Sequence, residues 1–290
     1  MKLLPMAAVF WGACLTSALG QISVEVAVDQ EQFLPNESLV LRVRISNLSG
    51  QTLSLGKTAD WLSFTVEAKD SFVVKQVRPV PVAGEFTLES SRIATKRVDL
   101  APCFDLAKAG RYSVIATVNI PQWTRAYSSQ PKTFDISSGT KLWEAAFGVP
   151  EPSGAPKGSP EVRKYVLQQA VNLKEIRLYF RLTDVSESRT FRVFPIGSLV
   201  SFSHPEPQLD SLSNLHVLFQ NGARTFSYCV INPEGILMAR ETHEYTTTRP
   251  ALRAGPGGKI VVAGGARRTT PDDLPPPAPT PSADAKPTSP

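Results

Sequence analysis

The chain has 290 residues, a net charge of +5 and 42% hydrophobic residues. That length allows one large domain or two smaller ones. The basic residues are scattered along the chain rather than gathered with aromatic residues into a stripe, so the charge pattern gives no support for nucleic-acid binding. We therefore expect no nucleic-acid partner.

The first twenty residues have the pattern of a secretory signal peptide. Lys2 gives a positive start, residues 3–19 form an apolar run, and the small residues Ala18 and Gly20 fit a cleavage site after Gly20. A membrane anchor is the weaker alternative, because a spanning helix needs about 20 strongly apolar residues. We expect a signal peptide at 1–20, a periplasmic or extracellular protein, and no transmembrane anchor after cleavage.

Two cysteines, Cys103 and Cys229, remain after that cleavage. An oxidising compartment would allow them to pair, and the bridge would then staple together two regions that we assign to different domains. The alternative is two buried thiols, which pack as small apolar side chains. The sequence does not give the Cα separation that a disulfide requires, so both alternatives stay open.

Residues 21–136 contain short runs in which apolar and polar residues alternate. Period-two alternation predicts strands with one buried and one solvent-exposed face. Several such strands separated by polar turns predict a β-sandwich. The clearest runs are ISVEVAVD (22–29), SLVLRVRISN (38–47), WLSFTVEA (61–68) and RYSVIATVNI (111–120).

Two stretches of this region resemble bacterial immunoglobulin-like domains. In FDLAKAGRYSVIATV (104–118), Tyr112 follows a glycine turn and resembles a tyrosine corner, whose hydroxyl bonds to upstream backbone. FLPNESLVLRVRISNLSGQTLSLG (33–56) resembles the opening of macroglobulin-type repeats and of the Bacillus-type proteinase-inhibitor domain. The resemblance implies an immunoglobulin-like fold, but it says little about function, because functional sites are grafted onto folds.

Residues 137–160, SSGTKLWEAAFGVPEPSGAPKGSP, are rich in glycine, proline and serine. This composition predicts a linker, with Trp143 and Phe147 as anchors that dock part of it on a domain surface.

A second antiparallel β region is predicted over 161–270. Apolar residues at helical spacing begin at Val162, yet Tyr165 and Leu167 also fit a strand that turns near Asn172. We predict a strand for 162–175, because the next run, IRLYFRLTD, alternates clearly and places Tyr179 on its polar face.

The dipeptide Asn221-Gly222 between alternating runs predicts a hairpin with a two-residue type I′ turn. The register that follows places His216 opposite Ser227, with Leu215, Val217, Phe219, Phe226 and Tyr228 on one apolar face. The unit 205–240 resembles one blade of a sialidase-type β-propeller. A propeller needs about four to eight blades, whereas this region can hold at most two or three, so we predict an incomplete, propeller-like β-meander.

The glycine-rich segment RAGPGGKIVVAGGARR (253–268) does not fit a phosphate-binding loop. Arg253 stands where the first glycine belongs, and Ile260 stands where serine or threonine belongs. Gly255–Gly258 fits a type II turn instead, and we expect no cofactor. The segment 271–290 is rich in proline and poor in large apolar residues, which predicts a disordered tail.

The three histidines, His204, His216 and His243, lack metal-ligand spacing, and the sequence has no Cys-x-x-Cys motif, so we expect no metal site. No nucleophile elbow is present either. The polar residues Asp210, His216, Tyr228, Arg240 and His243 fall together in the hairpin region, and Asp210, His216 and His243 among them are weak catalytic candidates. The alternative for His216 is a hydrogen-bonded structural histidine, because catalysis also needs a positioned partner and a perturbed pKa.

The leading hypothesis is therefore an exported, non-catalytic β-protein with a binding or structural role at the cell envelope. Its partner would be a protein or an envelope glycan, contacted through loops or a sheet edge. One alternative is an envelope-associated hydrolase with a site near His216. Another is a proteinase inhibitor that acts through a loop of the N-terminal domain.

Overall fold

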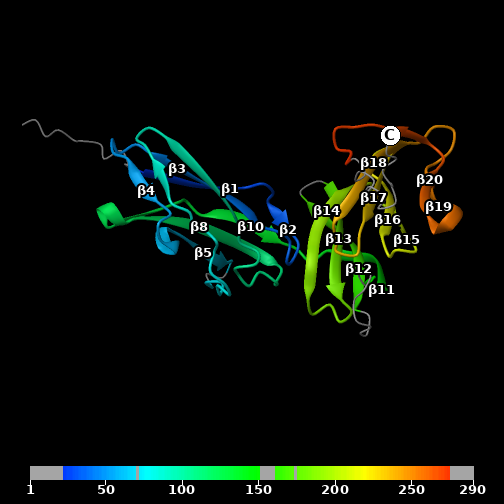
Figure 1. The fold of residues 1–290 in the computed structure, drawn as a ribbon, viewed down its shortest axis with the longest axis horizontal. Coiled ribbons are helices and arrows are strands. Elements are labelled where there is room, and N and C mark those ends of the chain that lie inside the picture. The colour runs from blue at the N-terminus through cyan, green and yellow to red at the C-terminus, as the bar shows by residue number, and fades with distance from the viewer. Residues whose placement is uncertain (1–21, 70–71, 151–160, 173–174, 275–290) are drawn as a thin grey trace, which may run out of the picture.

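A computed structural model describes residues 22–69, 72–150, 161–172 and 175–274. Strands dominate, and the helical segments among these residues are the single turns η1 (Ala59–Trp61), η2 (Pro121–Trp123) and η3 (Pro256–Gly258). The all-β prediction is confirmed (Figure 1). None of the described helical segments is long and apolar enough to cross a membrane. The predicted signal peptide lies outside the described residues.

The N-terminal half, β1 to β10, is a sandwich of two sheets with a small extra ladder. One sheet has the order β1-β3-β7, and the other has β2-β10-β8-β5, with β9 also paired to β8. All pairs of strands are antiparallel except β2 with β10, which is parallel. The small extra ladder is the antiparallel pair of β4 and β6. The strands are β1 (Ile22–Val28), β2 (Gln32–Phe33), β3 (Val40–Asn47), β4 (Leu53–Leu55), β5 (Leu62–Ala68), β6 (Phe86–Leu88), β7 (Ile93–Asp99), β8 (Gly110–Ile120), β9 (Arg125–Ser128) and β10 (Lys132–Ile136).

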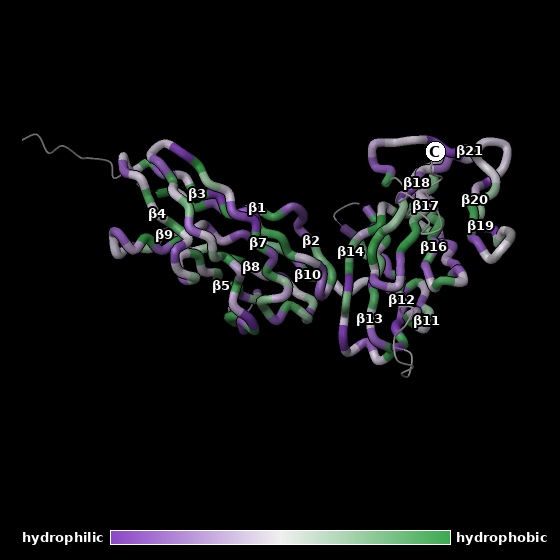
Figure 2. Tube along the Cα trace, viewed as in Figure 1, coloured by the Kyte–Doolittle hydropathy of each residue, from purple (hydrophilic) through white to green (hydrophobic). Residues whose placement is uncertain are grey.

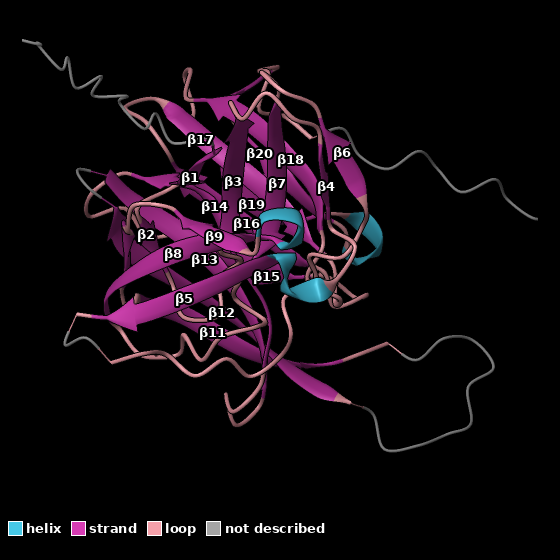
Figure 3. Cartoon of the chain, turned by 90° about the vertical axis from the view of Figure 1, so that its left-hand side faces the viewer, coloured by secondary structure: helices cyan, strands magenta, loops and turns pink. Residues whose placement is uncertain are grey.

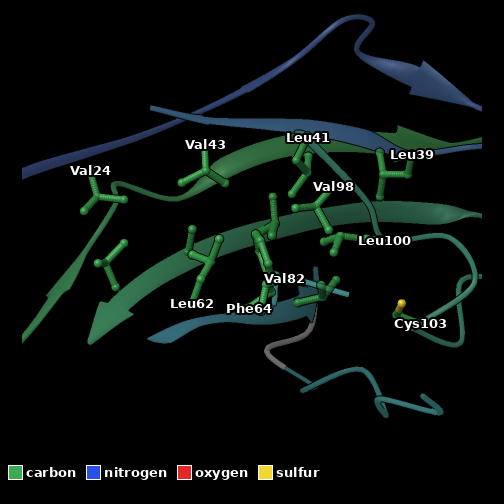
Figure 4. Close-up of a cluster of buried hydrophobic side chains, with 14 of the residues drawn as sticks. Val24, Leu39, Leu41, Val43, Leu62, Phe64, Val82, Val98, Leu100 and Cys103 are labelled. Carbon is green, nitrogen blue, oxygen red and sulfur yellow. The ribbon is translucent and has the colours of Figure 1, made fainter. Parts of the chain in front are cut away.

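The core of this sandwich consists of the residues that alternation placed inward. In Figure 2 hydrophobic segments run along the strands, and the close-up in Figure 4 shows Leu41 and Val43 of one sheet facing Leu62 and Phe64 of the other. Trp61 closes the core at 1% exposure and donates its indole N–H to the Val82 carbonyl at 2.9 Å. The predicted strands and their buried faces are confirmed here.

The predicted tyrosine corner is also confirmed. The Tyr112 hydroxyl donates to the Lys108 carbonyl oxygen at 2.7 Å, and the ring stacks on Phe134 with centroids 5.6 Å apart. This bond fixes the loop that leads into β8, the central strand of its sheet.

The C-terminal half begins with a four-stranded meander of β11 (Thr140–Gly148), β12 (Val162–Asn172), β13 (Glu175–Asp184) and β14 (Thr190–Leu199). Strand β12 confirms the strand predicted from residue 162. Strand β11 shows that the linker prediction was wrong over 140–148. Phe147 is buried there and stacks on Tyr165 at 3.9 Å, and pairing with β12 provides the backbone hydrogen bonds. The linker residues 151–160 lie outside the described residues.

A second sheet packs face to face on this meander, and a hairpin covers the far side of the second sheet. The layers therefore follow one another as sandwich, meander, second sheet and hairpin along the horizontal axis of Figure 1. Figure 3 looks along this stack from the side of the sandwich. The second sheet contains β15 (Glu206–Leu209), β16 (Leu215–Gln220), β17 (Thr225–Ile231), β18 (Leu237–Glu244) and β21 (Ala266–Arg268). The covering hairpin consists of β19 (Ala251–Ala254) and β20 (Ile260–Ala263).

The turn of the covering hairpin is the type II turn expected from the glycines. Gly257 adopts φ 72° and ψ 18°, as the third residue of such a turn requires. The Gly255 N–H donates to the Lys259 carbonyl at 2.7 Å. The glycine-rich segment therefore turns the chain between two strands.

The register predicted for the hairpin β16–β17 was wrong. The last pair between the two strands is Gln220 with Phe226, so five residues, 221–225, separate them in place of two, and His216 lies opposite Val230 instead of Ser227. Neither Asn221 nor Gly222 has the positive φ that a type I′ turn needs. A register change of an odd number of residues exchanges the faces, so Cys229 and Ile231 now share the face of Leu215, Val217 and Phe219.

Both faces of this second sheet are buried. Leu215, Val217 and Phe219 pack toward the meander. Leu218, Phe226 and Tyr228 pack on the other side, against Leu252 of the covering hairpin. Strands buried on both faces lose the apolar–polar alternation from which the predicted register was derived.

An apolar cluster joins the two halves. Leu34 of the N-terminal sandwich packs with Ala170, Tyr179 and Val193 of the meander. Tyr179, which alternation placed on a polar face, is therefore only 1% exposed. The Arg177 guanidinium donates to the Gln30 side-chain oxygen at 3.3 Å across the same contact.

The structure decides between the two alternatives left open for the cysteines and corrects the start of the predicted tail. Cys103 and Cys229 are both buried and unpaired, in separate clusters, so they form no bridge and the alternative of two packed thiols holds. The predicted tail begins later than residue 271, because Leu274 exchanges backbone hydrogen bonds with Arg240. Residues 275–290 of the predicted tail lie outside the described residues.

Candidate functional site

The polar residues singled out in the sequence do come together on the second sheet. His216 on β16 bridges two partners: its Nδ1 lies 2.6 Å from the Tyr228 hydroxyl on β17, and its Nε2 lies 3.3 Å from a carboxylate oxygen of Asp210. This chain of three side chains faces the covering hairpin. We call it the His216 network.

Asp210 is held in place by the loop between β15 and β16. Its carboxylate accepts hydrogen bonds from the backbone N–H groups of Leu212 and Asn214, at 2.9 and 2.8 Å, and from the Asn214 side chain. Burial acts to raise the pKa of Asp210, but the hydrogen bonds from Asn214 and His216 outweigh it and hold that pKa below its ordinary value. Asp210 is therefore an ionised acceptor that orients the imidazole.

The surroundings of Tyr228 shift its pKa in the opposite direction to that of Asp210. Burial, together with the nearby carboxylates of Glu241 and Asp210, raises the pKa of the Tyr228 phenol. The phenol therefore stays protonated and can donate to His216 Nδ1, while Nε2–H donates to Asp210. Every polar group of the His216 network then has a partner.

His243 lies beside this network without joining it through a hydrogen bond. Its ring meets the Tyr228 ring edge-on with centroids 6.2 Å apart, and its Nε2 contacts Glu241 at 3.2 Å. Arg267 on β21 pairs with the same Glu241 carboxylate at 3.1 Å. Arg240, which the sequence grouped with these residues, pairs with Cys229 in the strand register and lies on the other face of the sheet.

The order carboxylate, histidine, hydroxyl matches that of a catalytic triad. Two features oppose that chemistry. His216 and Tyr228 are each 7% exposed beneath the covering hairpin, and a nucleophilic hydroxyl needs activation, whereas the raised pKa of Tyr228 keeps its proton in place. The arrangement suits a satisfied buried network better than a reaction centre.

Open cavities lie elsewhere. A groove of about 400 Å³ is lined by residues that include Phe202, His204, Glu206, Gln220 and Arg249. Glu206 is paired with Arg249 at 3.6 Å, and His204 has no hydrogen-bonded carboxylate among the described residues to orient it as a base.

A groove of about 350 Å³ lies in the N-terminal sandwich and is lined by Ser49, Gln51, Trp123 and Arg125. Sequence reasoning missed it, because its two walls are 72 residues apart and carry no motif. A third groove, of about 320 Å³, lies between the halves, where Asn36 and Asp99 face Phe191 and Arg192.

Metal binding gains no support from the side chains. Within residues 22–69, 72–150, 161–172 and 175–274, no cluster of three or more histidine, cysteine, aspartate or glutamate residues could hold an ion.

Fold and site together describe an all-β chain whose conspicuous polar network is buried and whose grooves are open. No protein-family model matches the chain, and no curated protein matches it. Among solved structures, it is similar to the sporulation control protein Spo0M from Bacillus subtilis. The identity is 10% over 62% of this chain and 91% of that chain, with a TM-score of 0.32. A likeness at this level carries no argument about function.

Proposed function

We propose that this chain is an exported, non-catalytic binding protein of the cell envelope that contacts its partner through loops at open grooves. The observation that supports this most is the state of the His216 network. Its histidine has both ring nitrogens engaged and is almost completely buried. The grooves that a partner could enter are lined by other residues.

A co-sedimentation experiment tests this proposal. The chain from Gln21 to Pro290 is mixed with the envelope fraction of the cells that produce it, and the bound protein is measured against concentration. We expect saturable binding and no soluble sugars or peptides released from the envelope. Failure to bind, or release of products, would contradict the proposal.

The hydrolase alternative rests on the triad-like order of Asp210, His216 and Tyr228. It predicts that envelope material is cleaved and that the His216→Gln variant loses this cleavage. Product release should be followed by mass spectrometry for the original chain and for this variant. Release that depends on His216 would favour the hydrolase.

The proteinase-inhibitor alternative has one supporting feature, an exposed apolar loop after β5. Phe72 is 72% exposed and Val73 is 68% exposed. Isolated bridges from Val73 to Glu67 and from Gln76 to Phe104 anchor the loop on both sides. Incubation of the chain with a panel of proteases tests this alternative, and Phe72→Ala should abolish any inhibition that arises from this loop.

A further inference from the structure

The groove lined by Ser49, Gln51, Trp123 and Arg125 lies at the free end of the N-terminal sandwich. One wall is the loop after β3, and the other is the turn η2 with the start of β9. In Figure 1, η2 is the green coil at the end of the sandwich far from the C-terminal half. The contact between the halves, at Leu34, lies at the opposite end, so this groove is open to a partner.

The first wall is held rigidly by a buried side chain. Asn47 is 0% exposed. Its amide NH₂ donates to the carbonyl oxygens of Gln51 and Leu88, at 2.7 and 2.9 Å, and its amide oxygen accepts from the Ser49 N–H and hydroxyl, at 3.1 and 2.7 Å. Ser49 and Gln51 are therefore fixed before any ligand arrives, as an effective binding site requires.

The second wall contains backbone strain. Thr124 has φ 50° and ψ 40°, a left-handed conformation that a β-branched residue rarely adopts. Trp123 precedes it, lies half-buried with its ring edge-to-face to Tyr127 at 6.4 Å, and donates its indole N–H to the Gln51 side-chain oxygen at 3.3 Å. Strain of this kind costs about 1–3 kcal/mol and gathers at binding sites.

The free hydrogen-bonding groups of the groove define the ligand. Gln51 uses its amide oxygen on Trp123, which leaves its NH₂ group able to donate. Arg125 is exposed and has no ion pair with any residue that the structure describes. The Ser49 hydroxyl donates to Asn47, and its oxygen accepts from the Gln51 N–H at 3.3 Å, so this hydroxyl is used within the first wall. The groove thus offers mainly donors, one of them a cation, beside an aromatic ring.

A saccharide that carries a carboxylate fits this combination. The apolar C–H face of a sugar ring packs on an indole, and its carboxylate accepts two parallel hydrogen bonds from a guanidinium. We propose that this groove binds an acidic saccharide, with the sugar ring on Trp123 and its carboxylate on Arg125. The inference rests on the proposed function, since it names the ligand class of a binding protein.

The test is isothermal titration of the chain from Gln21 to Pro290 with trigalacturonate and with a muramic-acid disaccharide. Each probe is paired with its methyl ester, which keeps the ring and removes the charge. We expect both acids to bind in the micromolar to millimolar range and the esters about tenfold more weakly, because a hydrogen bond between charged groups is lost. Inorganic phosphate should not compete at equal concentration.

Substitutions in the groove, with a control outside it, distinguish a loss of ligand binding from a general effect on folding. Arg125→Ala should remove the preference for acid over ester, and Gln51→Ala should weaken both. Trp123→Phe, which keeps an aromatic ring in the packing, should weaken both as well. Arg78→Ala removes an exposed arginine near Cys103, at the opposite end of the same sandwich, and should change nothing.

The outcomes distinguish this inference from the proposed function. No binding of either acid, equal binding of acid and ester, full competition by phosphate, or an Arg125→Ala variant with unchanged preference would each overturn the saccharide site. If the chain still binds the envelope in those cases, the proposed function stands with a different ligand. If it binds neither saccharide nor envelope, both proposals fail.

Discussion

The two halves of the chain are built from the same kind of antiparallel sheet but bury it differently. In the N-terminal sandwich each sheet has one apolar and one solvent-facing side, as Arg44 and Glu25 on the outer face of β3 and β1 show. In the C-terminal half the second sheet is covered on both sides. The comparison teaches that double coverage forces polar groups inward, where they must find partners.

The largest expected loss of stability tests whether the covering hairpin buries the outer side of the second sheet. Leu218→Ala removes a side chain that is 1% exposed between the second sheet and the covering hairpin. It should lower the free energy of unfolding by about 2–5 kcal/mol, measured by chemical denaturation. Arg44→Ala on the outer face of β3 is the control and should leave the midpoint nearly unchanged. Equal small effects would mean that the hairpin does not cover the sheet.

A smaller loss is expected in the His216 network. Tyr228→Phe leaves the buried Nδ1 of His216 without its partner, which should cost about 1–3 kcal/mol of unfolding free energy. Tyr127→Phe is the matched control, since the Tyr127 hydroxyl has no hydrogen-bond partner within the described part of the chain. If both variants unfolded at the same denaturant concentration, the network would not be a closed structural unit.

A pH-dependent effect is expected where the halves meet. Glu37 is 6% exposed and accepts hydrogen bonds from Gln30 and from the Leu34 N–H. Burial raises the pKa of Glu37 despite these bonds and the nearby Arg177. The contribution of Glu37 to stability is therefore complete below the ordinary glutamate pKa and is lost as pH rises through its folded value.

Glu37→Gln should remove this part of the pH profile. Denaturation series from pH 4 to pH 8 should show that the variant gains stability relative to the original chain as pH rises. Glu85→Gln, at an exposed position, serves as the control and should follow the original profile. A constant difference between Glu37→Gln and the original chain at every pH would contradict the expected titration.

The smallest expected effect is that of Glu187 on stability, and it changes with pH in the opposite direction to that of Glu37. Glu187 bridges Lys141 and Lys164, at 2.7 and 2.9 Å, on the meander. Hydrogen bonds from these lysines lower the pKa of Glu187 to about 2. Its contribution to stability is present above the ordinary glutamate pKa and is lost as pH falls toward 2. Glu187→Gln should cost about 0–1 kcal/mol near neutral pH, and this difference should disappear in acid.

The difference in burial also explains how much could be predicted from the sequence. Where one face is exposed, alternation located β1, β3, β5 and β8 with their buried faces, and the tyrosine corner at Tyr112 followed from a local pattern. Where both faces are buried, the polar signal disappears, and a single misjudged turn at Asn221 reversed the faces of a whole hairpin. Coverage by a distant segment is a tertiary property that no local pattern contains.

The candidate sites also differ in how far the sequence could predict them. His216, Asp210 and Tyr228 are close in the chain, so a short range of sequence sufficed to group them, although the assumed register was wrong. Gln51 and Trp123 belong to separate loops of the N-terminal sandwich and meet only through its fold. Strand β11 was missed because packing of Phe147 on Tyr165, rather than composition, decides its structure.

The central claim is that the C-terminal polar network is structural and that ligand contact occurs at the free end of the N-terminal sandwich. One measurement tests it directly: co-sedimentation with the envelope fraction for His216→Gln and Arg125→Ala beside the original chain, each corrected for its folded fraction. We predict that His216→Gln binds as the original chain does and that Arg125→Ala loses most of its binding. Loss in His216→Gln with full binding by Arg125→Ala would contradict the claim.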